Sequence, residues 1–269
     1  MSTTSPAIQQ QRSHRGKRVG SIIGWTLTAL WVLSNILWIL TEGNTRDALT
    51  IAGVTLLFAA SLTHSLSSRG AAWTLACFAI ACGFGWTIEA LGTNTGWPFG
   101  EYEYTDRLGP HLGAVPLLIP MAWAMMAYPI YAVVERTGWN RLARIALAAG
   151  LLATWDLFLD PQMVAEGHWV WSSTEPAIPG LPGIPISNYL GWVIAALILM
   201  SLLTLLLPAR PGAPIAQPMT ALTWVYVGNV MANAVFLSRP AVALVGGVAM
   251  GIPMAILVLR LRTLQLDDG

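Results

Sequence analysis

Apolar residues recur in eight long stretches along this chain, separated by short polar segments. Each stretch has roughly 20 residues, enough for a helix to cross the bilayer core of about 30 Å. The predicted helices run from Val19 to Thr41, Asp47 to Ser65, Gly70 to Gly92, Val115 to Glu135, Arg141 to Asp160, Asn188 to Pro208, Gln217 to Leu237 and Pro240 to Arg262. The last two share a tight turn. The pattern predicts an all-α fold, a polytopic integral membrane bundle of about eight transmembrane helices.

The same pattern gives the domain organisation. We expect a basic tail over residues 1–18, a single transmembrane domain over 19–262 and a short tail over 263–269. Two connections within the domain are long, 93–114 and 161–187, and both are rich in Gly, Pro and Trp. Because Gly and Pro form defined turns and the composition differs from that of flexible linkers, we expect two ordered loops that cap a site.

Composition and charge support a membrane location and suggest an orientation. Only 10% of the residues are charged, 55% are hydrophobic, and the mean hydropathy is +0.60. Eleven of the fourteen Lys and Arg residues fall on the side of the N-terminus, and three, Arg46, Arg107 and Arg239, on the other. Positive residues favour the cytoplasmic side, so we expect both termini in the cytoplasm and a multi-pass protein of the plasma membrane. The net charge of +1 gives no reason to expect a nucleic-acid partner.

Three carboxylates interrupt the apolar helices near their predicted outer ends: Glu89, Asp156 and Asp160. Ionisable groups within membrane helices are costly and usually functional, so these three are the candidate catalytic residues. Asp160 precedes Pro161 and could instead end its helix. Asn188, Asn229 and Asn233 lie at the same predicted level and are candidate substrate-binding residues. Hydrogen bonding between helices, at about 0.6 to 2 kcal/mol each, is the open alternative for these asparagines.

Aromatic residues are concentrated near the same predicted side. The candidates for substrate binding are Trp86, Trp97, Tyr104, Trp155, Trp169 and Trp171. An interfacial aromatic belt would explain tryptophans there, but a belt alone would occupy both sides of the membrane. Aromatic faces stabilise cations by about 0.5 to 2 kcal/mol each, so acids beside aromatics suit carbocation chemistry. His111 and His168 are interpreted as solvated loop residues, and the sequence contains no motif that predicts a metal site.

Two segments of the chain resemble each other. Each has a carboxylate near the end of one helix, a Gly-Trp cap and a Pro before the returning helix. The first contains Glu89, Gly96, Trp97 and Pro116, and the second contains Asp156, Gly167, Trp169 and Pro185. A parallel internal duplication would explain the similarity, and so would coincidence, because Gly, Trp and Pro are common at membrane interfaces.

A family resemblance covers these segments. GFGWTIEALGTNTGWPFGEYEY, VPLLIPMAW, WDLFLDPQMVAEGHWVW and ISNYLGW, in order from about Gly83 to Trp192, resemble the carotenoid biosynthesis membrane proteins, which include the carotenoid hydratases of bacterioruberin and related pathways. The flanking helices match only in hydrophobicity, and the connection from Ala177 to Pro185 departs from the family pattern. The resemblance implies an enzyme that hydrates the terminal isoprenoid double bond of an acyclic C40 or C50 carotenoid such as lycopene. The implied partners are this substrate and the lipid bilayer, with other carotenoid biosynthesis enzymes as candidates, and no cofactor or metal is implied.

The chemistry of the residues agrees with that implication. Hydration of such an alkene requires protonation of carbon and capture of a tertiary cation by water. We expect Asp156 or Glu89 to donate the proton, because burial keeps a carboxyl group protonated, while the other carboxylate, with Asp160 or Asn188, positions water.

Other functions remain as alternatives. A carotenoid end-group cyclase would use the same cation, a carotenoid-binding protein would need no acid, and a proton-coupled transporter would relay protons through the acids. A polyprenyl transferase is disfavoured, because one DxxxD pattern and few outer Lys or Arg residues cannot hold diphosphate and Mg²⁺. A retinal protein is excluded because Lys17, the only lysine, lies in the tail.

Overall fold

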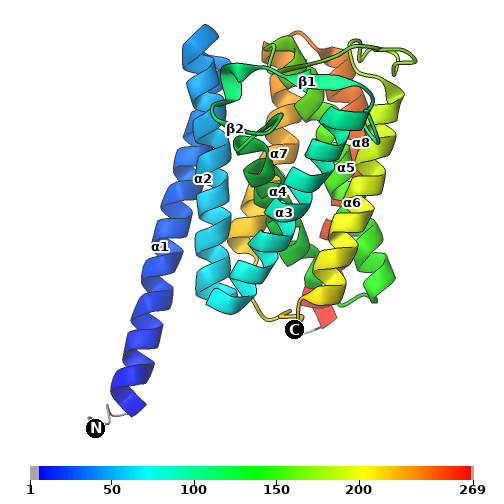
Figure 1. Ribbon diagram of the computed structural model, residues 1–269. Coiled ribbons are helices and arrows are strands. Elements are labelled where there is room, and N and C mark those ends of the chain that lie inside the picture. Colours follow the sequence, from blue (N-terminus) through cyan, green and yellow to red (C-terminus); the bar gives the residue numbers. More distant parts are fainter. Residues whose placement is uncertain (1–5, 268–269) are drawn as a thin grey trace.

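The computed structural model describes residues 6–267 and forms a bundle of helices (Figure 1). Within that range, eight helices are long and apolar enough to cross a membrane, which confirms the predicted all-α membrane bundle. They are α1 (Pro6–Ile39), α2 (Gly43–Arg69), α3 (Ala71–Thr95), α4 (Leu118–Glu135), α5 (Arg141–Ala165), α6 (Ile186–Leu206), α7 (Ala216–Met231) and α8 (Pro240–Asp267). A π-helical turn, η2 (Ala232–Phe236), extends α7. Residues 1–5 of the predicted first tail and 268–269 of the second lie outside the described residues.

Helix α1 begins and helix α8 ends at the same end of the bundle (Figure 1). The long loops lie at the opposite end, above the helices that carry the three carboxylates. An even number of spans requires this arrangement. Which end faces the cytoplasm stays a prediction from the charge distribution.

The helix boundaries differ from prediction around the two loops. α5 continues through Pro161 to Ala165, so Asp160 lies inside the helix instead of ending it. A proline removes only its own N–H bond, and the backbone bonds resume beyond it, with Glu166 N donating to Gln162 O. α4 begins at Leu118 because the preceding Val115 and Pro116 form a short strand.

The two loops fold together into one cap. β1 (Tyr102–Tyr104) in the first loop pairs antiparallel with β4 (Trp169–Trp171) in the second, with Glu103 opposite Val170. The first loop also holds the 3-10 turn η1 (Asp106–Leu108) and a small hairpin of β2 (His111–Leu112) and β3 (Val115–Pro116). Pairing between strands of the two loops therefore gives both loops a defined structure. The residue composition alone did not indicate this pairing.

Ion pairs hold this cap on the end of α2. Arg107 donates to both oxygens of Asp47, at 2.9 Å from Nε and 2.8 Å from Nη2. Arg46 Nη1 lies 2.7 Å from Glu166 Oε1. Both contacts join the first residues of α2 to the two loops, so the cap is tied to the bundle on the side opposite α6.

The helices differ in how far they are buried. α4 lies at the centre, with apolar side chains on all sides, and 89% of the residues in this helix are buried. α1 packs mainly along α2 at the edge of the bundle (Figure 1) and leaves many apolar side chains exposed. Such exposure is expected of a helix that faces lipid.

Candidate active site

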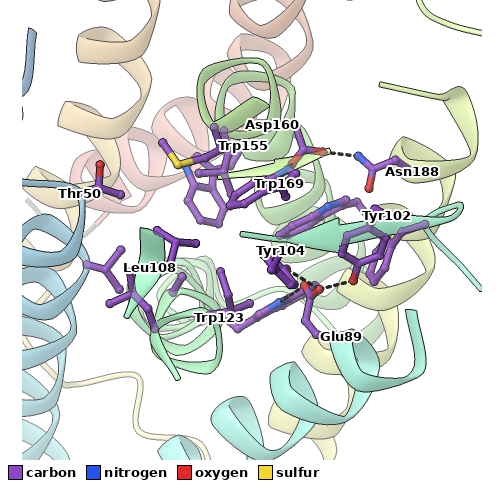
Figure 2. Close-up of a pocket in the computed structure, with 18 of the residues that line it drawn as sticks. Thr50, Glu89, Tyr102, Tyr104, Leu108, Trp123, Trp155, Asp160, Trp169 and Asn188 are labelled. Atoms are coloured by element: carbon purple, nitrogen blue, oxygen red, sulfur yellow. Dashed lines mark hydrogen bonds between the residues drawn. The ribbon is translucent and has the colours of Figure 1, made fainter. Parts of the chain in front are cut away.

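A cavity lies directly beneath the cap (Figure 2). It is enclosed by α2, α3, α4, α5, α6 and the two cap strands. Its polar side chains are those of Thr50, Glu89, Tyr102, Tyr104, Asp160 and Asn188. Most of the remaining wall is aromatic or aliphatic, so the carboxylates face an apolar space. A largely apolar pocket with a few convergent polar groups is the usual form of a small-molecule site.

Glu89 lies on one wall of the cavity and is held by three neutral donors (Figure 2). Tyr102 and Tyr104 donate to Oε2 at 2.5 and 2.7 Å, and Trp123 Nε1 donates to Oε1 at 2.9 Å. Among the side chains that the structure describes, none of the ion pairs includes Glu89. Burial disfavours the charged form of this carboxylate, and the three donors oppose that effect.

The two tyrosines that hold Glu89 come from strand β1 of the cap. Side chains two residues apart in a strand point to the same face, so Tyr102 and Tyr104 both reach down to the same oxygen. Burial raises the pKa of Tyr102, and so does the neighbouring Glu89; the same two causes raise the pKa of Tyr104. Both hydroxyl groups therefore stay protonated and act as donors.

Asp156 and Asp160 lie on the other side, one helical turn apart on α5. Asn188 at the start of α6 donates through Nδ2 to both: to Asp156 Oδ2 at 3.0 Å and to Asp160 Oδ2. Trp169 Nε1 donates to Asp160 Oδ1 at 3.2 Å. Asp156 Oδ1 has no hydrogen-bond partner among the described residues. Two carboxylates that are buried around one amide are costly to ionise together.

Two stacked tryptophans form part of the cavity wall. Trp123 of α4 and Trp192 of α6 stack face to face, with ring centroids 4.4 Å apart and an interplanar angle of 6°. Trp155 meets the edge of Trp192 at 6.0 Å, and Phe84 meets Trp123 in the same way at 5.8 Å. Aromatic faces therefore line the cavity that contains Glu89 and Asp160.

The geometry supports the interpretation of the two segments as a duplication. Trp123 follows Pro116 by seven residues, Trp192 follows Pro185 by seven, and the two rings stack. Gly96 and Gly167 both end their helices with positive φ, at 74° and 71°.

This correspondence changes the pairing of the acids. Glu89 precedes Gly96 by seven residues, and Asp160 precedes Gly167 by the same number. From the sequence alone, Glu89 of the first segment was matched with Asp156 of the second instead. The two corresponding carboxylates, Glu89 and Asp160, are the ones that line the cavity.

The predicted site residues divide into three groups. Those at the cavity are Glu89, Tyr104, Trp155, Asp160, Trp169, Trp171 and Asn188. Asp156 is fully buried behind the wall and reaches the site through Asn188. Trp86 and Trp97 are exposed away from the cavity, Asn229 lines a second cavity, and Asn233 is buried with its amide donating to Asn229 O at 2.9 Å.

Several side chains at the cavity were not predicted. Tyr102 and Trp123 are direct partners of Glu89, and Phe99 completes the aromatic wall. The alternation in Glu101-Tyr102-Glu103-Tyr104 is the signal that could have placed both tyrosines on one face. No comparable signal marks Trp123, whose role depends on the rotation of α4.

His168 corrects a prediction. It is fully buried, not solvated, because it lies at the junction of α5 and β4 beneath Arg107 and Asp47. Its Nε2 is 3.6 Å from Asp47 Oδ1. Burial lowers the pKa of His168, and Asp47 acts in the opposite direction. Within the described residues, no group of three or more His, Cys, Asp or Glu side chains is arranged to hold a metal.

Comparison with known proteins identifies similar chains. A family model described as "Carotenoid biosynthesis protein" matches residues 45–261, which include the whole cavity. Over 117 residues the chain is 34% identical to the bisanhydrobacterioruberin hydratase of Haloarcula japonica, and that match covers 42% of this chain. It spans only 38% of that relative's length. No solved structure matches.

Proposed function

This chain belongs to the carotenoid biosynthesis protein family, and from that premise we propose that it adds water to the terminal double bond of an acyclic carotenoid end group. The observation that carries the proposal is the arrangement of acids. Asp160 accepts from the same Asn188 amide as Asp156, Glu89 accepts from neutral donors, and Asp160 and Glu89 line one largely aromatic cavity. The similarity to a bisanhydrobacterioruberin hydratase supports the same reaction class.

In this proposal the Asp156–Asp160 pair supplies the proton. Asp160 lines the cavity, so it transfers the shared proton to a carbon of the alkene. The π electrons form the new C–H bond, and the adjacent carbon becomes a tertiary cation. Asp156 and Asn188 keep Asp160 oriented and share the negative charge that the transfer leaves. This differs from the simplest expectation, in which Asp156 or Glu89 donates directly.

Glu89 and the tryptophans then stabilise the cation. Glu89 accepts hydrogen bonds from three fixed donors, which favour its charged form, and we assign it the role of stabilising the cation. The faces of Trp123 and Trp192 add cation–π stabilisation of about 0.5 to 2 kcal/mol each.

Water capture completes the cycle. A water molecule attacks the tertiary cation and forms the C–O bond, and its extra proton returns to the Asp156–Asp160 pair. The product is a tertiary alcohol, and the acid pair is regenerated. The scheme balances without a cofactor. The proposed location is the plasma membrane, with the cap on the outer side, as the charge distribution predicts.

The experiment is pigment analysis in a lycopene-producing host that expresses this chain. We expect a product heavier by one water for each end that reacts, identified by chromatography and mass spectrometry. Asp160→Asn should abolish this product, while Gly83→Leu, at a lipid-facing position with open space around it, should retain it. A new isomer of unchanged mass would replace hydration by cyclisation, and unchanged pigment beside well-expressed protein would refute the proposal.

A further inference from the structure

A second cavity lies beside the first, between α1, α2, α5 and α7. Its wall is mainly apolar. Trp31, Trp38, Leu57, Trp224 and Val225 are among the residues that line it. The proposed hydration chemistry uses none of these residues.

The two cavities share a wall. Six residues line both: Thr50, Val54, Met125, Trp155, Leu159 and Met163. Apart from Thr50, these shared side chains are apolar, and the two methionines have flexible, unbranched chains. An elongated ligand in the second cavity would therefore reach the carboxylates past Met125 and Met163.

The second cavity also reaches the lipid-facing surface. Leu40 at the end of α1 is 71% exposed, Phe236 in η2 is 54% exposed, and Met231 is 46% exposed; all three line the cavity. These residues lie at the level of the cap, near the carboxylate end of the bundle. In a membrane, such an opening faces hydrocarbon, so an apolar ligand could enter without crossing water.

The polar side chains of this cavity are largely engaged with their own helices. Asn35 Nδ2 donates to Trp31 O, and Asn229 Nδ2 donates to Val225 O, both at 2.7 Å. Trp38 Nε1 donates to Thr50 Oγ1 at 2.9 Å. The cavity therefore offers few free donors and no carboxylate, which suits a hydrocarbon chain better than a polar group.

We infer that this second cavity binds the polyene chain of the substrate while the terminal isoprene unit lies at Glu89 and Asp160. The inference rests on the proposed function for the identity of the ligand. An acyclic carotenoid is stiff, apolar and comparable in length with the bilayer core of about 30 Å, so most of it must lie outside the carboxylate cavity. Of the two cavities, only the second combines direct continuity with the acids and an opening to lipid.

Narrowing the second cavity alone tests this inference. Gly228 of α7 lines it and does not line the carboxylate cavity, and the three atoms nearest to an added Cβ atom all belong to Trp224, a neighbour on the same helix. We would measure binding of purified lycopene to the detergent-solubilised chain by its absorption shift, for wild type, Gly228→Ala and Gly228→Leu. Gly83→Leu is the matched control, because it adds the same side chain at a membrane-helix position with nothing within 4 Å.

The inference predicts a graded loss of binding. Gly228→Leu should weaken lycopene binding by about tenfold or more, Gly228→Ala by less, and Gly83→Leu should bind as wild type does. Equal binding by Gly228→Leu and wild type, with matching melting curves, would overturn the inference. If Gly228→Leu fails to fold, Gly228→Ala becomes the test of the inference. Wild-type binding by Gly228→Ala would then overturn the inference.

Binding also separates this inference from the proposed reaction. If wild type binds lycopene in the Gly228-sensitive manner but forms no hydrated product, the reaction is wrong and the binding site stands. If wild type hydrates lycopene and Gly228→Leu binds it normally, the reaction stands and the binding site is wrong.

Discussion

The two ends of the bundle each bury a glutamate among aromatic side chains, and they satisfy it in opposite ways. Beneath the cap, Glu89 accepts from Tyr102, Tyr104 and Trp123, all neutral. At the end where the termini lie, Glu135 pairs with Arg69, with Oε2 at 2.8 Å from Nη1. One carboxylate lacks a cation, and the other already has one.

The surroundings of the two glutamates also differ, because the partner of Glu135 is a buried cation. Arg69 is enclosed by rings, with its guanidinium carbon 4.5 Å from the centroid of Trp73 and 5.6 Å from that of Tyr131. Glu135 also accepts from the backbone N–H of Arg210 at 2.8 Å. Neither member of this pair lines the two cavities described above, whereas Glu89 does. The comparison supports our proposal that the Arg69–Glu135 pair is structural and that Glu89, beneath the cap, faces a substrate cation.

The largest expected effect comes from removing the acid opposite Glu89. Asp160→Asn keeps the shape but cannot supply a proton, so turnover should fall by about 10³-fold or more, the scale of general acid catalysis. The measurement is product formation per mole of folded protein, with melting temperature as control. Turnover within a few-fold of wild type would show that the proton comes from elsewhere.

Breaking the Arg69–Glu135 pair should lower stability and leave the chemistry intact, the opposite of Asp160→Asn. Glu135→Gln leaves Arg69 buried without its counter-charge, which typically costs about 3 kcal/mol or more in stability. We expect a lower melting temperature in detergent, with normal turnover for the fraction that remains folded. A stable variant that is inactive would contradict the structural role assigned to this pair.

Neutralising Glu89 should affect turnover and not stability, in contrast to the change at Glu135. Glu89→Gln retains an acceptor for its donors but removes the charge that faces the cation, so turnover should fall by about 10²-fold. Thermal stability should change little, unlike that of Glu135→Gln. A large loss of stability with unchanged turnover would make Glu89 a packing residue instead.

The smallest effect is expected from single tyrosine hydroxyls, which can be compared directly at the two ends. Tyr102→Phe removes one donor to Glu89, and turnover should fall by about tenfold, since a hydrogen bond to a charged group contributes about 1.5 kcal/mol. Tyr131→Phe removes the 3.3 Å contact to Glu135 and should leave turnover unchanged. Equal losses in both variants would indicate a general packing effect.

Much of the fold follows from patterns that are local in the sequence. Apolar runs of membrane length predicted every span, because a helix in lipid must satisfy its own backbone and cover itself with apolar side chains. Glu89, Asp160 and Asn188 were predicted for the same reason, since a polar group in such a run stands out. The end of α5 was misplaced because Pro161 is compatible with the last turns of a helix when later bonds resume.

The contacts within the site could not be predicted in this way. Tyr102 reaches Glu89 only because β1 pairs with β4, and that register joins residues far apart in the sequence. Trp123 and Trp192 meet because α4 and α6 approach each other with matching rotation. Trp86 and Trp97 have the same chemistry but point away from the cavity, and composition cannot distinguish the two sets.

Isotope incorporation tests the central claim most directly. The purified chain would be incubated with lycopene in D₂¹⁸O, and the product analysed by mass spectrometry and NMR. We predict one ¹⁸O in each new tertiary hydroxyl and one deuterium on the adjacent carbon, with both labels lost in Asp160→Asn. A product of unchanged oxygen content, or a hydroxyl oxygen that comes from a source other than water, would contradict hydration at this site.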